Sequence, residues 1–289
     1  MKPRFSLGDV HALVVDIDGT LLRGAQPLPG VSRFFAFLAA RRIPFVVASN
    51  NSTKSAAAYQ QKLASLGVPI ATEQILTAGA ATARFLASEL RQGTSLYVIG
   101  EPALETVLHQ AGFTLLDDAN QPAEAVVVGG DSNLTYEKLK HATLLLQRGA
   151  RFVGTNPDLL CPTEEGLVPE AGTTLAALEA ATGVAPTVIG KPARHLFEMA
   201  VAAIDSRRAT TAVLGDRLET DILGGQRAGL RTVLVTTGVD NESTMGQKGI
   251  EPDLVVSGLE ELVELWTLSG IEDRLDEYGE RASPDASGT

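Results

Sequence analysis

The sequence lacks three features that would place it in other classes of protein. It has one cysteine, Cys161, which excludes an intrachain disulfide framework and suits a reducing cytoplasm, where we expect the protein to act. No run approaches the ~18 apolar residues of a membrane span, and residues 1–10 hold no stretch of signal-peptide length. A net charge of −11 argues against a nucleic acid polymer as partner, because phosphate contacts need clustered lysine and arginine.

What the chain does contain is an apolar run near its start, residues 12–15, followed by Asp16 and Asp18. Such a run predicts a strand buried in a parallel sheet, and ligands of open α/β sheets bind at the carboxyl ends of strands. Two carboxylates spaced two apart in extended chain point to the same side and repel unless a cation lies between them. Mg²⁺ prefers oxygen ligands of this kind. The alternative is an Asp-Gly turn after a strand.

A second predicted strand, residues 43–48, ends in Ser49, Asn50 and Asn51. Serine and asparagine are preferred at helix N-caps, so a structural role is one interpretation. A hydroxyl, amides and free backbone N–H groups at the start of a helix also bind anions, and this is the interpretation we favour for Ser49 and, less firmly, for Asn50.

Two later strand ends carry charged residues. Lys191 follows a predicted strand at 186–189, and Asp216 and Asp221 follow a predicted strand at 211–214. A lysine is usually a solvated surface residue, and an acid near a helix N-terminus can simply stabilise the helix dipole. Asp216, at the step from strand to helix, is harder to explain in that way.

The middle of the chain alternates short strands and helices between residues 94 and 186, which predicts a second α/β unit with its own small sheet. We therefore expect a domain of residues 1–79 and 186–268 interrupted by an inserted domain of residues 80–185. Within the insertion, residues 155–172 form a long loop, and such loops are often functional. The acidic segment 269–289 is expected to be disordered.

Together the motifs Asp-Ile-Asp-Gly-Thr-Leu, Ser-Asn-Asn, Gly-Lys-Pro and Gly-Asp-Arg-Leu-Glu-Thr-Asp resemble, in order, the four motifs of the haloacid dehalogenase superfamily, most of whose members are phosphatases. An α/β insertion between the second and third motifs resembles the class II cap branch, and Thr-Asn-Pro-Asp at 155–158 resembles its NagD and p-nitrophenyl phosphatase subfamily. The resemblance implies a Rossmann-like parallel sheet with helices on both faces, plus a smaller α/β cap.

The resemblance also implies a role for each motif residue. Asp16 would attack phosphorus and form an aspartyl-phosphate, and Asp18 would first protonate the leaving group and then activate water. The residues expected to bind the substrate are Ser49, Asn50, Asn51 and Lys191. Those expected at Mg²⁺ are Asp16, Asp18 through its backbone carbonyl, Asp216 and Asp221.

The predicted activity is Mg²⁺-dependent hydrolysis of small phosphate monoesters. The expected partner is a small phosphorylated metabolite such as a nucleotide monophosphate, phosphoglycolate, a sugar phosphate or pyridoxal phosphate, and the expected assembly is a homodimer formed through the cap. The alternative is a receiver-type signalling module, which also forms an aspartyl-phosphate on clustered acids but turns over little. A receiver would not need the large insertion, and the acid/base Asp18 favours turnover.

Overall fold

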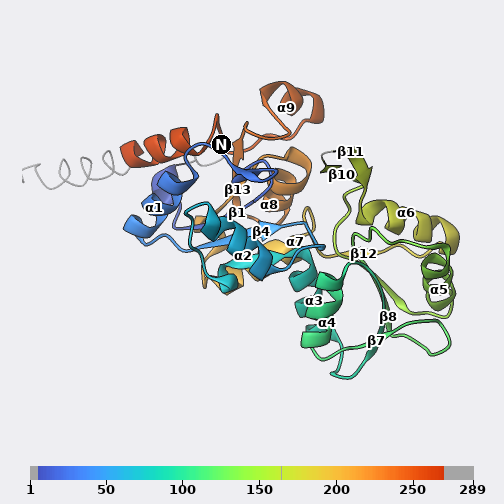
Figure 1. Cartoon of the computed structure of the whole chain (residues 1–289). Helices are drawn as coiled ribbons and strands as arrows, with labels where there is room; N and C mark the ends of the chain where they lie inside the picture. Colours follow the sequence, from blue (N-terminus) through green and yellow to red (C-terminus); the bar gives the residue numbers. More distant parts are fainter. Residues whose placement is uncertain (1–5, 164, 270–289) are drawn as a thin grey trace, which may run out of the picture.

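The computed structural model describes residues 6–163 and 165–269. Figure 1 shows two lobes: one, the core, contains both ends of the described chain (blue, orange and red), and the other, the cap, contains its middle (green and yellow). The predicted acidic tail lies outside the described residues except for Ser269, which is helical. In the described part of the chain, no helix combines the length and the apolar character that crossing a membrane requires.

The core is organised around a six-stranded sheet in the order β15-β14-β13-β1-β4-β5, in which every neighbouring pair is parallel. Its strands are β1 (Ala12–Val15), β4 (Phe45–Ser49), β5 (Ile75–Thr77), β13 (Thr211–Gly215), β14 (Arg231–Val235) and β15 (Leu254–Val256). All four residues of β1 are buried, as expected for a central strand covered on both faces.

Helices cover both faces of this core sheet. One face packs against α1, α2 and the helical residues 259–269, and the other packs against α3 and α7. The helix bounds are α1 (Val31–Arg41), α2 (Ala56–Ser65), α3 (Ala78–Glu89), α7 (Arg194–Ala203), α8 (Leu223–Arg227) and α9 (Glu242–Lys248). This arrangement confirms the predicted Rossmann-like α/β fold. The short helix α9 and strand β5 were not predicted.

The cap has its own parallel sheet of five strands in the order β12-β9-β8-β6-β7. Helices α5 and α6 cover one face, and α4, which also contacts α3 of the core, covers the other. The cap elements are β6 (Ser95–Ile99), α4 (Pro102–Gln110), β7 (Thr114–Leu116), β8 (Ala125–Val128), α5 (Tyr136–Gln147), β9 (Arg151–Gly154), α6 (Ala171–Thr182) and β12 (Thr187–Val188). Strand β7 was not predicted.

One predicted strand belongs to the other sheet. The strand expected at residues 186–189 exists as β12, but it pairs with β9 of the cap, so its assignment to the core is wrong. The pairing continues beyond β12, because Gly190 N donates to Thr155 O at 2.8 Å. Which sheet a two-residue strand joins depends on the sheet edge that lies beside it in the folded chain, and the local sequence does not indicate that edge. The predicted boundary at residue 79 falls inside α3, which packs on β5 and α7 of the core as well as on α4 of the cap, and the division otherwise stays a prediction.

Two antiparallel strand pairs were not predicted, one of them within the segment expected to be a long loop. Within residues 155–172, β10 (Leu160–Thr163) pairs with β11 (Gly166–Pro169), and near the first motif β2 (Leu22–Arg23) pairs with β3 (Gln26–Pro27). The β10–β11 pair exposes apolar side chains, including Leu160 and Leu167. Long segment 155–172 is therefore a structured projection of the cap.

Candidate active site

Polar residues meet at one edge of the core sheet because three adjacent strands end there. Asp16 follows β1, Ser49 is the last residue of β4, and Asp216 follows β13. These strands are neighbours and parallel, so their carboxyl ends lie side by side. All three side chains are buried. Buried polar groups at this edge need partners, and the partners define the site.

Lys191 reaches this edge from the chain that follows β12 and pairs with two acids. Its Nζ donates to Oδ1 of Asp16 and, at 2.6 Å, to Oδ1 of Asp221. Burial alone would lower the pKa of Lys191, but the carboxylates of Asp16 and Asp221 raise it above its usual value. The lysine therefore stays charged, and its charge lies beside the carboxylate of Asp16.

Asp16, Asp216 and Asp221 form a compact acidic cluster in which one ligand atom from each lies within 4.8 Å of the others. Burial raises the pKa of Asp16 well above its ordinary value, against the opposing effect of Lys191 and with the support of the two neighbouring acids. Burial and then the charge of Asp221 raise the pKa of Asp216 to about 7. Three buried acids and one lysine leave an excess of negative charge.

The carboxylate of Asp216 is held tightly on one side and free on the other. Its Oδ2 accepts a hydrogen bond from Val239 N at 2.8 Å. A Cβ on Gly19 or Gly238 would come within 2.2 Å or 1.9 Å of that oxygen, so both positions need glycine. Its Oδ1 is buried and has no hydrogen-bond partner among the described residues. An orphaned carboxylate oxygen beside two other acids fits a hard divalent cation.

The loop after β14 supports this cluster and was missed in the sequence. Thr237 Oγ1 donates to the carbonyl of Gly19 at 2.7 Å, and Asp240 N donates to the carbonyl of Asp216 at 3.1 Å. The Asp240 carboxylate also accepts from Leu218 N at 2.7 Å. β14 lies next to β13 in the core sheet, so the rule used for the other strand ends could have identified this loop.

Ser49 has a hydroxyl that can donate toward the site. Its Oγ accepts from Asn51 N at 3.1 Å and lies 3.5 Å from the hydroxyl oxygen of Tyr59. Burial, followed by the charge of Asp18, raises the pKa of Tyr59, so this phenol stays protonated and can donate to Ser49. The Ser49 proton is then available to an oxygen of a bound anion. Tyr59 therefore lies next to the site. The sequence did not identify it, because it lies within the predicted helix after Ser49 and not at a strand end.

The two asparagines after Ser49 make different contacts. Asn50 binds the main chain of Lys191 with both ends of its amide, and its Nδ2 also donates to Asp158 at 2.9 Å. Oδ1 of Asn51 accepts from Thr53 N at 2.8 Å and thereby shapes the turn before α2. Both amides therefore organise the loop in this structure.

Asp18 lies apart from the acidic cluster. Its side chain is exposed, whereas that of Asp16 is buried, and it is not one of the three clustered acids. Burial raises the pKa of Cys161 in β10, and the charges of Glu170 and Asp18 raise it further. An exposed carboxyl group next to the acidic cluster in sequence, but outside it, is free to exchange a proton with a substrate or with water.

The cap contributes Asp158, which two core side chains hold. Its Oδ2 accepts from Asn50, and its Oδ1 accepts from Nη1 of Arg217 at 3.1 Å. Asn156 Nδ2 donates to the carbonyl of Asn50 at 2.9 Å. The sequence gave no sign that these residues would meet, because Asn50 and Asp158 are 108 positions apart.

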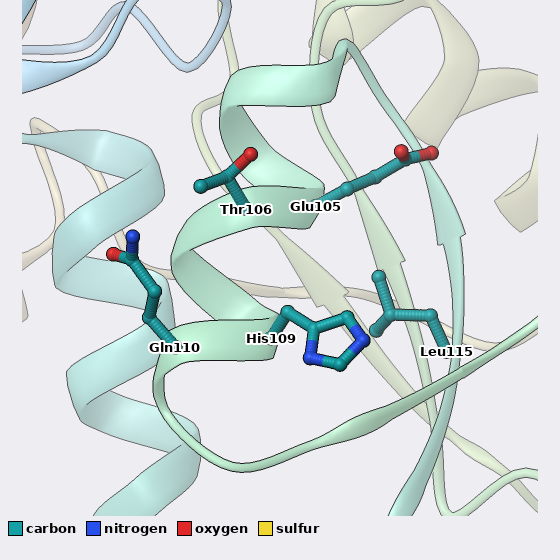
Figure 2. Close-up of a pocket in the computed structure, with 5 residues that line it drawn as sticks. All are labelled: Glu105, Thr106, His109, Gln110 and Leu115. Carbon is teal, nitrogen blue, oxygen red and sulfur yellow. The ribbon is translucent and has the colours of Figure 1, made fainter.

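An open hollow of about 460 Å³ lies elsewhere on the cap, between α4 and β7. Figure 2 shows its lining, with His109 beside Leu115. None of the residues that line it belongs to the strand-end motifs or to the acidic cluster. The chemistry of the core sheet edge therefore identifies the candidate active site, and the size of this hollow does not.

Known proteins match both the sequence and the fold. The family described as haloacid dehalogenase-like hydrolase matches residues 13–114, and the HAD-hydrolase-like family matches residues 188–262. The dihydroxyacetone phosphatase of Corynebacterium glutamicum is 36% identical over 88% of this chain and 90% of its own length. The acid sugar phosphatase of Staphylococcus haemolyticus is also 36% identical, over 83% of this chain and 90% of its own.

Solved structures give the same result. The 4-nitrophenylphosphatase of Thermotoga maritima is 34% identical with a TM-score of 0.84, covering 89% of this chain and 98% of that one. NagD from E. coli is 30% identical with a TM-score of 0.79, covering 86% and 97%. The glycerol phosphate phosphatase of Mycobacterium tuberculosis, solved in complex with magnesium, is 33% identical with a TM-score of 0.81, covering 89% and 77%.

The fold, the acidic strand ends and these matches define the class of protein, a hydrolase of phosphoric monoesters. The chain belongs to the haloacid dehalogenase-like hydrolase superfamily. The predicted resemblance to the NagD and p-nitrophenyl phosphatase branch is thereby confirmed.

Proposed function

We propose that this phosphatase hydrolyses small phosphate monoesters with the help of Mg²⁺ and through an aspartyl-phosphate on Asp16. The observation that carries the proposal is the cluster of Asp16, Asp216 and Asp221 with its unpartnered Asp216 oxygen, next to the charged Lys191. The relatives support it, since they are named as phosphatases of dihydroxyacetone phosphate, sugar phosphates and glycerol phosphate, one of them solved with magnesium.

The residues that would hold Mg²⁺ are Asp16, Asp216 and Asp221, with the backbone carbonyl of Asp18. When bound, the cation neutralises negative charge on the phosphoryl oxygens and so makes attack by an anionic carboxylate feasible. The donor set fits this role because all three side chains offer oxygen ligands, and Oδ1 of Asp216 has no hydrogen-bond partner in the part of the chain that the structure describes.

In the first step, a carboxylate oxygen of Asp16 forms a bond to phosphorus, and the bond from phosphorus to the ester oxygen breaks. The hydrogen bond from Lys191 Nζ fixes the orientation of the Asp16 carboxylate. Asp18 gives its proton to the departing alkoxide, which leaves as an alcohol. The hydroxyl of Ser49 and the charge of Lys191 hold phosphoryl oxygens during the transfer.

In the second step, the Asp18 carboxylate takes a proton from water while the water oxygen bonds to phosphorus. The bond between phosphorus and Asp16 breaks, which releases inorganic phosphate and restores both acids. This step separates an enzyme from the receiver-type alternative, in which the aspartyl-phosphate persists. The exposed position of Asp18 supports the proposal, because a base on the open side of the site can reach water.

We propose further that segment 155–172 of the cap selects the leaving group. The core edge recognises phosphate, which all monoesters share, so the choice among substrates needs other residues. The β10–β11 projection is exposed, and residues 156–158, which lead into it, contact Asn50 and Arg217 beside the site. Its acidic residues disfavour highly anionic leaving groups, which favours small monophosphates as partners.

The test is release of phosphate from p-nitrophenyl phosphate by purified protein with Mg²⁺, followed by a panel of dihydroxyacetone phosphate, glycerol phosphate, sugar phosphates, phosphoglycolate, pyridoxal phosphate and nucleotide monophosphates. EDTA should abolish turnover and Mg²⁺ should restore it. Turnover that persists after thorough chelation would overturn the metal role, and one phosphate released per chain without further turnover would favour the receiver-type alternative.

The remaining proposals concern the setting of the enzyme. A cytoplasmic location is proposed on the single cysteine, and a homodimer through the cap stays a prediction that light scattering coupled to size exclusion can test.

A further inference from the structure

The loop after β4 is where the core meets the cap. Asn156 of the cap donates from Nδ2 to the carbonyl of Asn50 at 2.9 Å, and Asn50 Nδ2 donates to Oδ2 of Asp158 at 2.9 Å. A further contact joins the cap to the same loop: Gly130 N of the cap donates to Oγ of Ser52 at 3.1 Å. The residues that follow cap strands β8 and β9 therefore contact the core loop that follows Ser49.

Asn50 also clamps the main chain of Lys191. Its Oδ1 accepts from Lys191 N at 2.7 Å, and its Nδ2 donates to Lys191 O at 2.9 Å. Gly190 permits this approach, because a Cβ there would lie 2.8 Å from Asn50 Oδ1. Both protons of the amide are now used, one on Lys191 O and one on Asp158, so none is left for a phosphoryl oxygen. The contacts of Asn50 serve Lys191.

Asp158 determines which end of the Asn50 amide faces which neighbour. A carboxylate only accepts hydrogen bonds, so the end of the amide that faces Asp158 has to be the NH₂ group. The amide oxygen then faces Lys191 N–H, as observed. Asp158 is itself fixed, since its other oxygen accepts from Arg217 and its N donates to Oδ1 of Asn156 at 3.0 Å.

We propose that Asp158 is a positioning residue for Lys191 and acts on it through Asn50. The cap carboxylate orients the amide, the amide fixes the main chain of Lys191, and that main chain determines whether Nζ reaches Asp16 and Asp221. The charge that stabilises phosphoryl transfer is then fully in place only while cap segment 155–158 lies on the core. This inference rests on the proposed role of Lys191 and adds a link between the cap and the rate of chemistry.

A positioning role predicts a loss in kcat with little change in KM. Asp158→Ala and Asn50→Ala, assayed with p-nitrophenyl phosphate at saturating Mg²⁺, should each lower kcat about 10–100-fold, the scale of lost support behind a site residue. KM should stay within about threefold. The double variant should be no slower than the worse single variant by more than about threefold, because residues in one chain of contacts do not act independently.

Two further variants make the result specific. Asp131→Ala is the matched control, because Asp131 is also a buried cap carboxylate in an ion pair, here with Lys138, and it should keep kcat within about twofold. Asp158→Asn keeps one acceptor oxygen and should therefore lower kcat less than Asp158→Ala does. Circular dichroism and thermal melting confirm that each variant is folded; if Asp158→Ala is not, the Asp158→Asn and Asn50→Ala pair carries the same non-additivity test.

The outcomes separate the proposals. A raised KM with unchanged kcat in Asp158→Ala would show that Asp158 binds substrate or only holds the cap, and would overturn the inference. Losses that multiply in the double variant would overturn it as well, since they would make the two residues independent. If the wild-type protein released no phosphate, the proposed function itself would fail, whereas a fully active Asp158→Ala variant would refute the inference alone.

Discussion

The core and the cap are both parallel α/β sheets, yet their strands end in different residues. Core strands β1 and β13 lead directly into Asp16 and Asp216. Cap strands β6 and β8 lead into Gly100 and Gly129. Each sheet therefore has an edge where the carboxyl ends of its parallel strands meet. Among the described residues, only that edge of the core sheet carries an acidic cluster.

Glycines at the carboxyl ends of the cap strands indicate that this edge of the cap sheet packs against neighbouring chain. A Cβ on Gly129 would lie 2.7 Å from Oγ of Ser52, and one on Gly130 would lie 2.6 Å from Glu170 Oε1. These positions need glycine because the core loop and the cap's own helix approach so closely. The cap uses its strand ends as a contact surface, whereas the core strand ends carry the acidic cluster to which we assign the chemistry. Fold alone does not decide which edge reacts.

The largest effect should separate the two edges directly. Asp16→Asn should lower kcat by at least about 10³-fold with the fold intact, because it removes the nucleophile and a metal ligand together. The matched change at a cap strand end, Glu101→Gln, should leave kcat within about twofold. Steady-state assays with p-nitrophenyl phosphate measure both. Activity within tenfold of wild type in folded Asp16→Asn would overturn the nucleophile assignment.

A lysine paired with a buried carboxylate in each lobe, Lys191 in the core and Lys138 in the cap, sharpens the comparison. Lys191→Ala should lose at least about 10²-fold in rate, the scale seen when a fixed charge-stabilising group is removed. Lys138→Ala removes the partner of a buried carboxylate in the cap and should leave kcat nearly unchanged. A near-normal rate in Lys191→Ala would return that residue to a purely structural role.

The clamp on Asp216 can be tested with two glycines of the core. Gly238→Ala places a methyl group where only 1.9 Å separates it from Asp216 Oδ2, so the carboxylate has to move. We expect the Mg²⁺ concentration for half-maximal activity to rise about tenfold or more. Gly246→Ala is the control, since a Cβ there meets nothing within 4 Å. Equal Mg²⁺ requirements for the two variants would show that the clamp does not tune the metal site.

Exchange of segment 155–172 for that of a relative with another preference should alter the ratio of kcat/KM between two metabolites by about threefold to tenfold. Hydrolysis of p-nitrophenyl phosphate should continue, because the core edge is unchanged. An unaltered ranking of substrates in a folded chimaera would make the segment a connector and move specificity elsewhere in the cap.

The smallest effect concerns the stability of the metal-free protein. Burial and Asp221 raise the pKa of Asp216 from 3.8 to about 7, so the folded state binds that proton more tightly than the unfolded chain does. The stability this group contributes is complete below pH 3.8 and is lost as the pH rises through about 7. Thermal melts in EDTA should therefore show a Tm that falls by a few degrees from about pH 5 to about pH 8.

Asp216→Asn should flatten that pH dependence, since an amide does not titrate, and saturating Mg²⁺ should flatten it in the wild type by favouring the ionised acid. A slope that is identical in wild type and Asp216→Asn would assign the pH dependence to other groups.

Local pattern was enough to predict much of the site. Asp16, Ser49 and Asp216 each follow a recognisable apolar strand, and the strand-end rule brought them to one edge, where the structure places them together. The rule did not predict the contacts of Asn50. Its partners Asp158 and Lys191 are 108 and 141 positions away, and a polar residue at a strand end looks the same whether it meets an anion or the main chain.

The errors in the fold have a similar cause. β12 was predicted as a strand, but its two residues do not indicate which sheet it joins, and β10 and β11, which contain Pro162 and Pro169, do not show the alternation from which strands are recognised. What places them is pairing with distant chain, β9 in the first case and each other in the second. Long-range pairing of short segments lies outside what a local pattern contains.

The ion pairs of Lys191 have a consequence for how the protein matures. Three acids enclosed without a counter-ion would oppose their own burial, and a site of that kind could form only around its metal. Here the chain brings its own cation, because Lys191 contacts Asp16 and Asp221 directly. Folding can therefore precede the binding of any cation, because the charge of Lys191 already offsets part of the negative charge that folding encloses.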